Sequence, residues 1–257
     1  MKRTILLALI ITASVGAANA TSITIVPVAS AAAAEAQENT WLAANFPANA
    51  TITTTETFES FNYGPWNQLV TGTGTFVAVP GGLPSDMSGT HTDQFTILNS
   101  SDTPFNGRYN TTTGGNNWLD SNDITLLQLN TSFSNLYFVM NDVNDTGGTL
   151  QIQTKDGTTS SGFAPTASNG QLYFVGITSS GPIGSIEWVN NIQHDGFGLD
   201  DFGTINCPSQ VPEPANLLTA AGGLLILLGS VRLRSRMGSA NLSTTPTRRT
   251  RARRESA

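Results

Sequence analysis

Short runs of Thr, Val, Ile, Phe and Tyr alternate with clusters of Gly, Asn, Asp and Ser from Thr51 to residue 206. This alternation constrains the fold most, because many short strands separated by regular turn signals favour an all-β sandwich. The dipeptide Asp156-Gly157 is typical of a tight hairpin turn. We therefore expect one antiparallel, jelly-roll-like β-sandwich over residues 31–206. The expected strands are 52–59, 74–79, 94–98, 124–130, 134–140, 148–155, 171–177, 183–189 and 199–206.

Two segments of different character precede these strands. Residues 21–30 are small and apolar and are predicted to be a linker. Residues 31–46 are rich in alanine and carry large apolar side chains at helical spacing, which predicts a short helix. Pro47 ends that pattern.

Charge is distributed unevenly along the chain. Residues 21–210 contain 16 acidic side chains but only two basic ones, Arg108 and Lys155, so this region carries a net charge of −14. Nucleic acid is therefore not expected as a partner, because binding phosphate needs a basic surface. A single cysteine, Cys207, excludes a disulfide scaffold or a cysteine-rich zinc module. It is either free or paired between chains.

Residues 1–20 contain the three parts of a secretory signal peptide. Lys2 and Arg3 form the charged part, residues 5–11 the apolar part, and Ala18-Asn19-Ala20 the small-residue cleavage site. The apolar run is short for a membrane span, so we expect export followed by cleavage by signal peptidase. An uncleaved membrane anchor is the alternative.

A second apolar segment, residues 215–231, carries no charge and is followed by Arg232, Arg234 and Arg236. Its 17 residues would form a helix about 26 Å long, enough to cross a thin hydrocarbon core. A buried core helix is the alternative. The positive-inside rule places residues 232–257 in the cytoplasm and the sandwich outside. That arginine-rich tail is predicted to be disordered; it either binds anionic lipid headgroups or has no function.

Residues 207–214 link the sandwich to this segment and contain Pro212, Glu213 and Pro214. The two prolines hold the backbone extended, in a form that a processing enzyme can grip. The motif, the apolar segment and the arginines together resemble the PEP-CTERM sorting signal of bacterial surface proteins. This resemblance implies that an exosortase, a membrane-embedded transpeptidase-like protease, recognises Pro212, Glu213 and Pro214. It also implies an inner-membrane-anchored precursor that ends at the cell surface or in the extracellular matrix. The chain departs from the family by continuing for 21 residues beyond Arg236.

Parts of the predicted sandwich also look like other domains that carry such signals. The similar stretches are the alanine-rich helix and residues 57–61, 142–150 and 195–202. This likeness implies a jelly-roll-like sandwich and no particular biochemical activity.

Glu59 follows the first expected strand, and Asp200 and Asp201 open the last one. In many jelly-roll carbohydrate-binding modules, which this arrangement resembles, carboxylates in such places share a structural calcium ion. Calcium needs six to eight oxygen ligands, so other residues such as Asp195 would have to contribute. Solvated turn residues are the alternative. The loop from Asp142 to Gly147 also carries alternating oxygen ligands, but a tight hairpin turn explains it more simply.

Tyr109 and Trp118 lie in an apparent loop rich in Asn and Gly, and they are candidates for stacking against a sugar. Packing in the protein interior is the alternative, and it is the expected role of Trp188. No catalytic triad or nucleophile elbow is recognisable, so we do not expect an enzyme. The leading hypothesis is a structural or adhesive protein in an exopolysaccharide or biofilm matrix. A calcium-stabilised carbohydrate-binding module is the alternative, and a secreted hydrolase is a weaker one.

Overall fold

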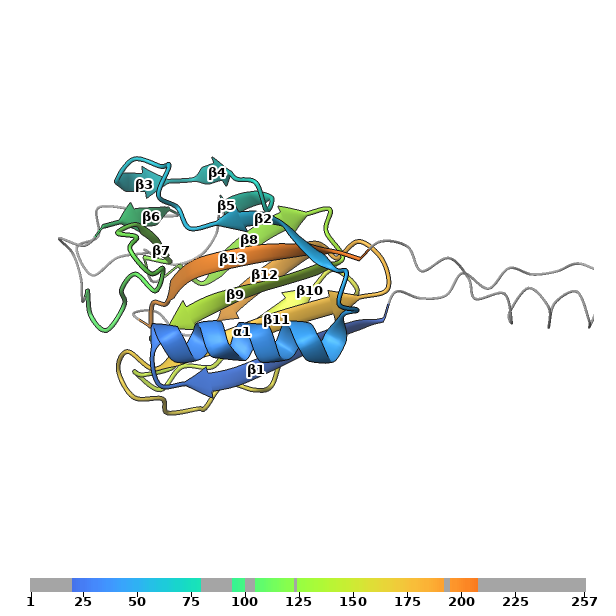
Figure 1. The fold of residues 1–257 in the computed structure, drawn as a ribbon. Helices are drawn as coiled ribbons and strands as arrows, with labels where there is room; N and C mark the ends of the chain where they lie inside the picture. The colour runs from blue at the N-terminus through green and yellow to red at the C-terminus, as the bar shows by residue number, and fades with distance from the viewer. Residues whose placement is uncertain (1–19, 80–93, 100–104, 123, 192–194, 208–257) are drawn as a thin grey trace, which may run out of the picture. The chain divides into compact units, whose positions relative to one another are not determined.

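The computed structural model describes residues 20–79, 94–99, 105–122, 124–191 and 195–207. Two antiparallel sheets pack face to face, and one helix covers the outer face of the larger sheet (Figure 1). The expected class, an all-β antiparallel sandwich with a short helix, is confirmed. Among the described residues, no helix combines the length and hydropathy needed to cross a membrane. The Pro-Glu-Pro motif, both predicted apolar segments and the arginine-rich tail lie outside the described residues.

Each strand expected from the sequence overlaps an observed one. In chain order the elements are β1 (Thr21–Val28), α1 (Ala31–Asn45), β2 (Thr51–Glu56), β3 (Gly64–Trp66), β4 (Gln68–Val70), β5 (Thr75–Ala78), β6 (Phe95–Leu98), β7 (Trp118–Asp120), β8 (Leu126–Thr131), β9 (Asn135–Asn141), β10 (Leu150–Thr154), β11 (Leu172–Ser179), β12 (Gly184–Asn190) and β13 (Gly198–Asn206).

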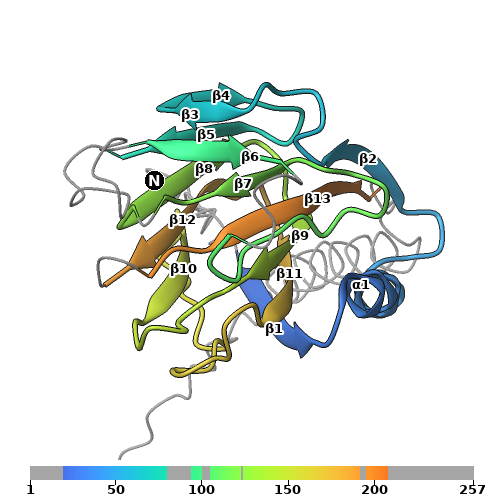
Figure 2. The ribbon, with the colours of Figure 1, turned by 90° about the vertical axis from the view of Figure 1, so that its left-hand side faces the viewer.

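The larger sheet, sheet A, has the strand order β1-β11-β9-β13-β7-β6-β3, and β2 also pairs with β13. Sheet B has the order β10-β12-β8-β5-β4 (Figure 2). β13 lies inside sheet A, with β9 on one edge. Its other edge is divided, because β7 pairs with residues 198–199 and β2 pairs with residues 202–206. This division leaves Asp200 and Asp201 at the gap between β7 and β2.

The main core lies between the two sheets and is rich in aromatic rings. Phe138 of β9 and Phe202 of β13 stack with their centroids 4.8 Å apart, and Trp188 of β12 meets Phe138 at 5.4 Å. All three side chains are fully buried, as expected for Trp188. Burying one such side chain contributes about 1.5–3 kcal/mol to stability, so these alternating inward positions hold the sheets together.

Helix α1 packs on the outer face of sheet A. Ser30 caps it by accepting a hydrogen bond on Oγ from the Ala33 N–H at 3.2 Å. Trp41 anchors the helix, because its ring lies against Phe174 and directly over Gly176. A Cβ at Gly176 would overlap the indole, so the glycine is what allows this close approach.

The predicted linker at residues 21–30 is wrong, because Thr21–Val28 form strand β1. All eight of its residues pair with β11, and Ile23 and Ile25 pack against the main core. The backbone of Ala20 extends this pairing: its N–H donates to Ser180 Oγ at 3.0 Å. The segment shows no clear strand pattern in the sequence. The strand is stabilised by its pairing with β11.

The loop from Asp142 to Gly147 is not the predicted hairpin. It connects β9 of sheet A to β10 of sheet B, and these two strands do not pair with each other. Positive φ angles at Asp142 and Asn144 let the chain turn between the sheets. The turn at Asp156-Gly157 is confirmed, with the Gly157 N–H bonded to the Thr154 carbonyl at 2.9 Å.

Candidate functional site: an acidic pocket between the helix and sheet A

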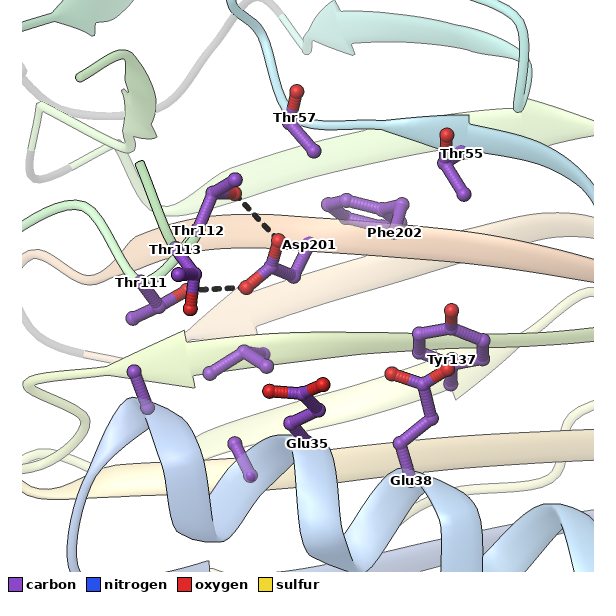
Figure 3. Close-up of a pocket in the computed structure, with 13 residues that line it drawn as sticks. Glu35, Glu38, Thr55, Thr57, Thr111, Thr112, Thr113, Tyr137, Asp201 and Phe202 are labelled. Atoms are coloured by element: carbon purple, nitrogen blue, oxygen red, sulfur yellow. Dashed lines mark hydrogen bonds between the residues drawn. The ribbon is translucent and has the colours of Figure 1, made fainter. Parts of the chain in front are cut away.

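A pocket of about 270 Å³ opens between the N-terminal half of α1 and the outer face of sheet A (Figure 3). Carboxylates from Glu35 and Glu38 face that of Asp201 across it. The residues that line it are Ala31, Ala34, Glu35, Glu38, Thr55, Thr57, Thr111, Thr112, Thr113, Tyr137, Val139, Asp201 and Phe202. Hydroxyl and carboxylate groups therefore surround the opening, and small apolar side chains leave room between them.

A bulge in β13 places Asp201 in this pocket. The register between β13 and β9 shifts between Asp200 and Gly203, and Asp201 adopts a φ of 50°. Phe202 then points into the core, and Gly203 lies opposite Tyr137. A Cβ at Gly203 would overlap the Tyr137 ring, so glycine lets this ring lie flat against β13 beside the pocket.

Asp200 lies beneath the pocket and is almost completely buried. Its carboxylate accepts hydrogen bonds from the backbone N–H of Thr111 at 2.7 Å and of Thr112 at 3.0 Å. The two threonine hydroxyls donate to Asp200 and also to Asp201. Burial, followed by the nearby charge of Asp201, raises the pKa of Asp200. The aspartate pair thus fixes the threonine loop at the pocket wall.

The pocket carries negative charge that no basic lining residue offsets. Arg108 and Lys155 are the basic side chains in the described region, and neither of them lines the pocket. Burial raises the pKa of Glu38, and the charges of Asp201 and Glu35 act in the same direction. Burial also raises the pKa of Asp201. A ligand with hydrogen-bond donors or a positive charge would relieve this repulsion.

Glu59, which the sequence grouped with Asp200 and Asp201, holds the other end of the same loop. Its carboxylate accepts hydrogen bonds from the backbone N–H of Asn116 at 2.6 Å and of Asn117 at 2.7 Å. These acids therefore fix residues 111–117, and Glu59 Oε1 and both carboxylate oxygens of Asp200 and Asp201 accept hydrogen bonds. No group of three His, Cys, Asp or Glu side chains in the described regions is placed to bind one metal ion. Calcium binding at Glu59, Asp200 and Asp201 stays a prediction.

The two candidate sugar contacts do not line the pocket. Trp118 is completely buried in β7, so its ring has no face open to a sugar, and its assignment to sugar stacking is corrected to packing. Tyr109 is half-buried, packs near Val139, and has its hydroxyl 3.5 Å from the Gly170 carbonyl. Sequence spacing put both residues in an exposed loop, whereas Trp118 begins a strand.

No protein-family model matches the chain, and no curated protein matches it either.

Sequence reasoning missed Glu35, Glu38 and Tyr137 as members of a site. The available signal was that both glutamates lie three residues apart on a helix whose other residues are uncharged. The sequence gave no indication that these glutamates share a pocket with Tyr137 and Asp201, because those two residues come from distant strands. Both histidines, like the sorting motif, lie outside the described residues.

Proposed function

We propose that this is an exported surface or extracellular-matrix protein whose β-sandwich adheres to extracellular polysaccharide through the acidic pocket. Export and exosortase processing are supported by the order of features in the sequence, from signal peptide to Pro-Glu-Pro motif, apolar segment and arginines. Adhesion is supported by one observation: three carboxylates and several hydroxyls surround an open pocket on an otherwise well-packed sandwich.

The pocket chemistry favours a neutral or amine-bearing sugar. Carboxylates accept hydrogen bonds from sugar hydroxyls or from a protonated amine, and charge-assisted hydrogen bonds are the stronger ones. A uronic acid would bring a further negative charge beside Glu35, Glu38 and Asp201. The volume of about 270 Å³ lies near the lower limit of small-molecule pockets, about 300 Å³, which suits one sugar unit of a longer chain.

We assign the pocket a binding role. Among the described residues, its carboxylates belong to no group of three His, Cys, Asp or Glu side chains that could hold a metal ion. Several separate hydrogen-bond acceptors, here carboxylate and hydroxyl oxygens, suit a polyatomic ligand with several hydrogen-bond donors better than a bare ion. If the domain instead hydrolyses glycans, soluble sugar products will appear after incubation with the protein.

Sorting is tested by intact-mass analysis of the protein from its native host, with and without an exosortase. We expect both ends to be removed, and the C-terminal removal to require the exosortase. Changing Pro212→Ala together with Glu213→Ala should block that removal and leave the precursor in the membrane. Unchanged processing in this double variant would rule out sorting through the Pro-Glu-Pro motif.

Adhesion is tested by binding the processed protein to arrays of neutral, amine-bearing and uronic-acid glycans. The substitution Glu38→Gln should weaken binding about tenfold, because it removes a charged hydrogen bond worth about 1.5 kcal/mol. The matched control is Glu187→Gln, which makes the same change in β12 of sheet B. Equal binding by both variants, or a preference for uronic acids, would contradict the role of the pocket. Binding abolished by EGTA would favour the calcium-stabilised module instead.

A further inference from the structure

The start of β1 and the end of β13 lie at the same end of sheet A, although they are the first and last strands (Figure 1). A chain of side-chain contacts connects them. The Thr21 hydroxyl donates to Ser179 Oγ at 3.2 Å, and the Ser179 N–H donates to Asn135 Oδ1 at 3.4 Å. Asn135 Nδ2 lies 4.0 Å from Cys207 Sγ. Residues 20 and 207, where the described chain begins and ends, thus leave the sandwich on one side.

An apolar groove of about 170 Å³ opens at this same end. It lies where α1 ends, β2 begins and β13 ends (Figure 1). Ile52 contributes the most exposed large side chain, at 43%. The lining residues are Leu42, Ala43, Phe46, Pro47, Ala48, Ala50, Thr51, Ile52 and Ile205. None of them is charged, in a domain whose net charge is strongly negative.

The chain on either side of the described residues suggests what meets this groove. Seven residues, 208–214, separate Cys207 from the apolar segment 215–231. Fully extended, they reach about 25 Å. On the other side, eight residues separate the apolar run ending at Ile11 from Ala20. Both connections are short, so a membrane that held either segment would tether the sandwich by the end that carries the groove.

We propose that this groove is a lipid-facing surface, which contacts the bilayer interface while the precursor is anchored. This inference rests on the proposed membrane anchoring. Apolar side chains in an uncharged setting can enter the headgroup region. The acidic pocket lies along the N-terminal half of α1, whereas the groove lies at the C-terminal end of that helix. Carboxylates of the pocket are therefore held back from anionic headgroups, and the glycan-binding opening stays free.

The test uses the full-length chain in phosphatidylcholine vesicles that contain phosphatidylglycerol. A fluorescent label on Ile52→Cys, in a Cys207→Ser background, is quenched by nitroxide-bearing lipids if the groove meets the bilayer. The matched control is Tyr63→Cys, a residue 59% exposed just before β3. Strand pairing connects β3 through β6 and β7 to the start of β13, at the opposite end. We expect quenching at Ile52→Cys to be severalfold stronger.

A second groove position guards against a local effect of the label. Ala48→Cys, also exposed, should give the same severalfold difference from Tyr63→Cys. Equal quenching at all three positions would overturn the proposal. Protection of the groove labels from both lipid nitroxides and soluble iodide would also overturn it, because a protein partner or a second copy would then cover the groove. If carbonate extraction releases the chain from the vesicles, the proposed membrane anchoring itself has failed.

Discussion

Arg108 Nη1 lies 2.7 Å from Asp120 Oδ1, and both side chains are buried. The guanidinium also lies 3.7 Å from the Asp142 carboxylate and 5.2 Å from the centre of the Phe105 ring. This arginine thereby fastens the loop before β7 to that strand and to the end of β9. The same loop continues into Thr111 and Thr112 at the pocket wall. The buried ion pair therefore helps to hold this wall of the pocket in place.

Replacing Arg108→Met should lower the free energy of unfolding by about 3–5 kcal/mol, because Asp120 would be left as an uncompensated buried charge. Urea unfolding followed by fluorescence measures the change. Lys155→Met is the matched control, since Lys155 is exposed, and its effect should stay within about 0.5 kcal/mol. Equal effects of the two substitutions would show that the Arg108 ion pair contributes nothing specific.

Gly176→Ala should destabilise the protein by roughly 1–3 kcal/mol, because the added methyl group overlaps the Trp41 ring. The cost should shrink in a Trp41→Ala background, where the methyl group has room. Thermal unfolding of the wild type, both single variants and the double variant completes the cycle, with an expected coupling of about 0.5–3 kcal/mol. Additive effects would mean that Trp41 does not lie over Gly176 in solution.

Stability should fall as the pH rises from about 4 to about 6. Burial raises the pKa of Asp195 from 3.8 to about 6. The folded state therefore binds more protons than the unfolded chain across this window, so deprotonation costs the folded state more. Asp142, whose pKa burial raises to about 7, extends the decline upward. Asp195→Asn removes the first contribution, and its unfolding free energy should exceed that of the wild type at about pH 8 but not at about pH 4.

The Gly148 N–H donates to Asp195 Oδ2 at 3.1 Å, and an asparagine oxygen can accept that same hydrogen bond. The comparison therefore isolates the charge of residue 195 from the contact it makes. Chemical unfolding at several pH values measures it, and parallel pH profiles for the two proteins would contradict the assignment.

Calcium should leave the melting temperature unchanged. The oxygens of Asp200 already accept hydrogen bonds from the backbone and hydroxyl groups of Thr111 and Thr112, so an ion would have to displace them. Differential scanning calorimetry with added calcium or EGTA measures this directly. A calcium-dependent rise that disappears in Asp200→Asn would instead support the calcium hypothesis.

The positions of most strands could be predicted because alternation of apolar and polar residues is a local property. β3, β4 and β7 were missed because three residues are too few to show a period. Glu59, Asp200 and Asp201 could be singled out from the sequence as a candidate calcium site, but their contacts depend on a loop whose position only the fold determines. The pocket itself was beyond prediction, because Glu38 and Asp201 meet only after α1 has packed across sheet A.

The central place of β13 in sheet A has a consequence for the life of the nascent chain. Synthesis delivers this strand last among the strands of the sandwich, yet β9, β7 and β2 all need it as a neighbour. Until it arrives, the aromatic faces of both sheets have no complete partner, and long-range pairing of this kind is slow. The sandwich therefore remains an open, aggregation-prone chain through most of its synthesis. Sheet A can be completed only after residue 206 has been synthesised.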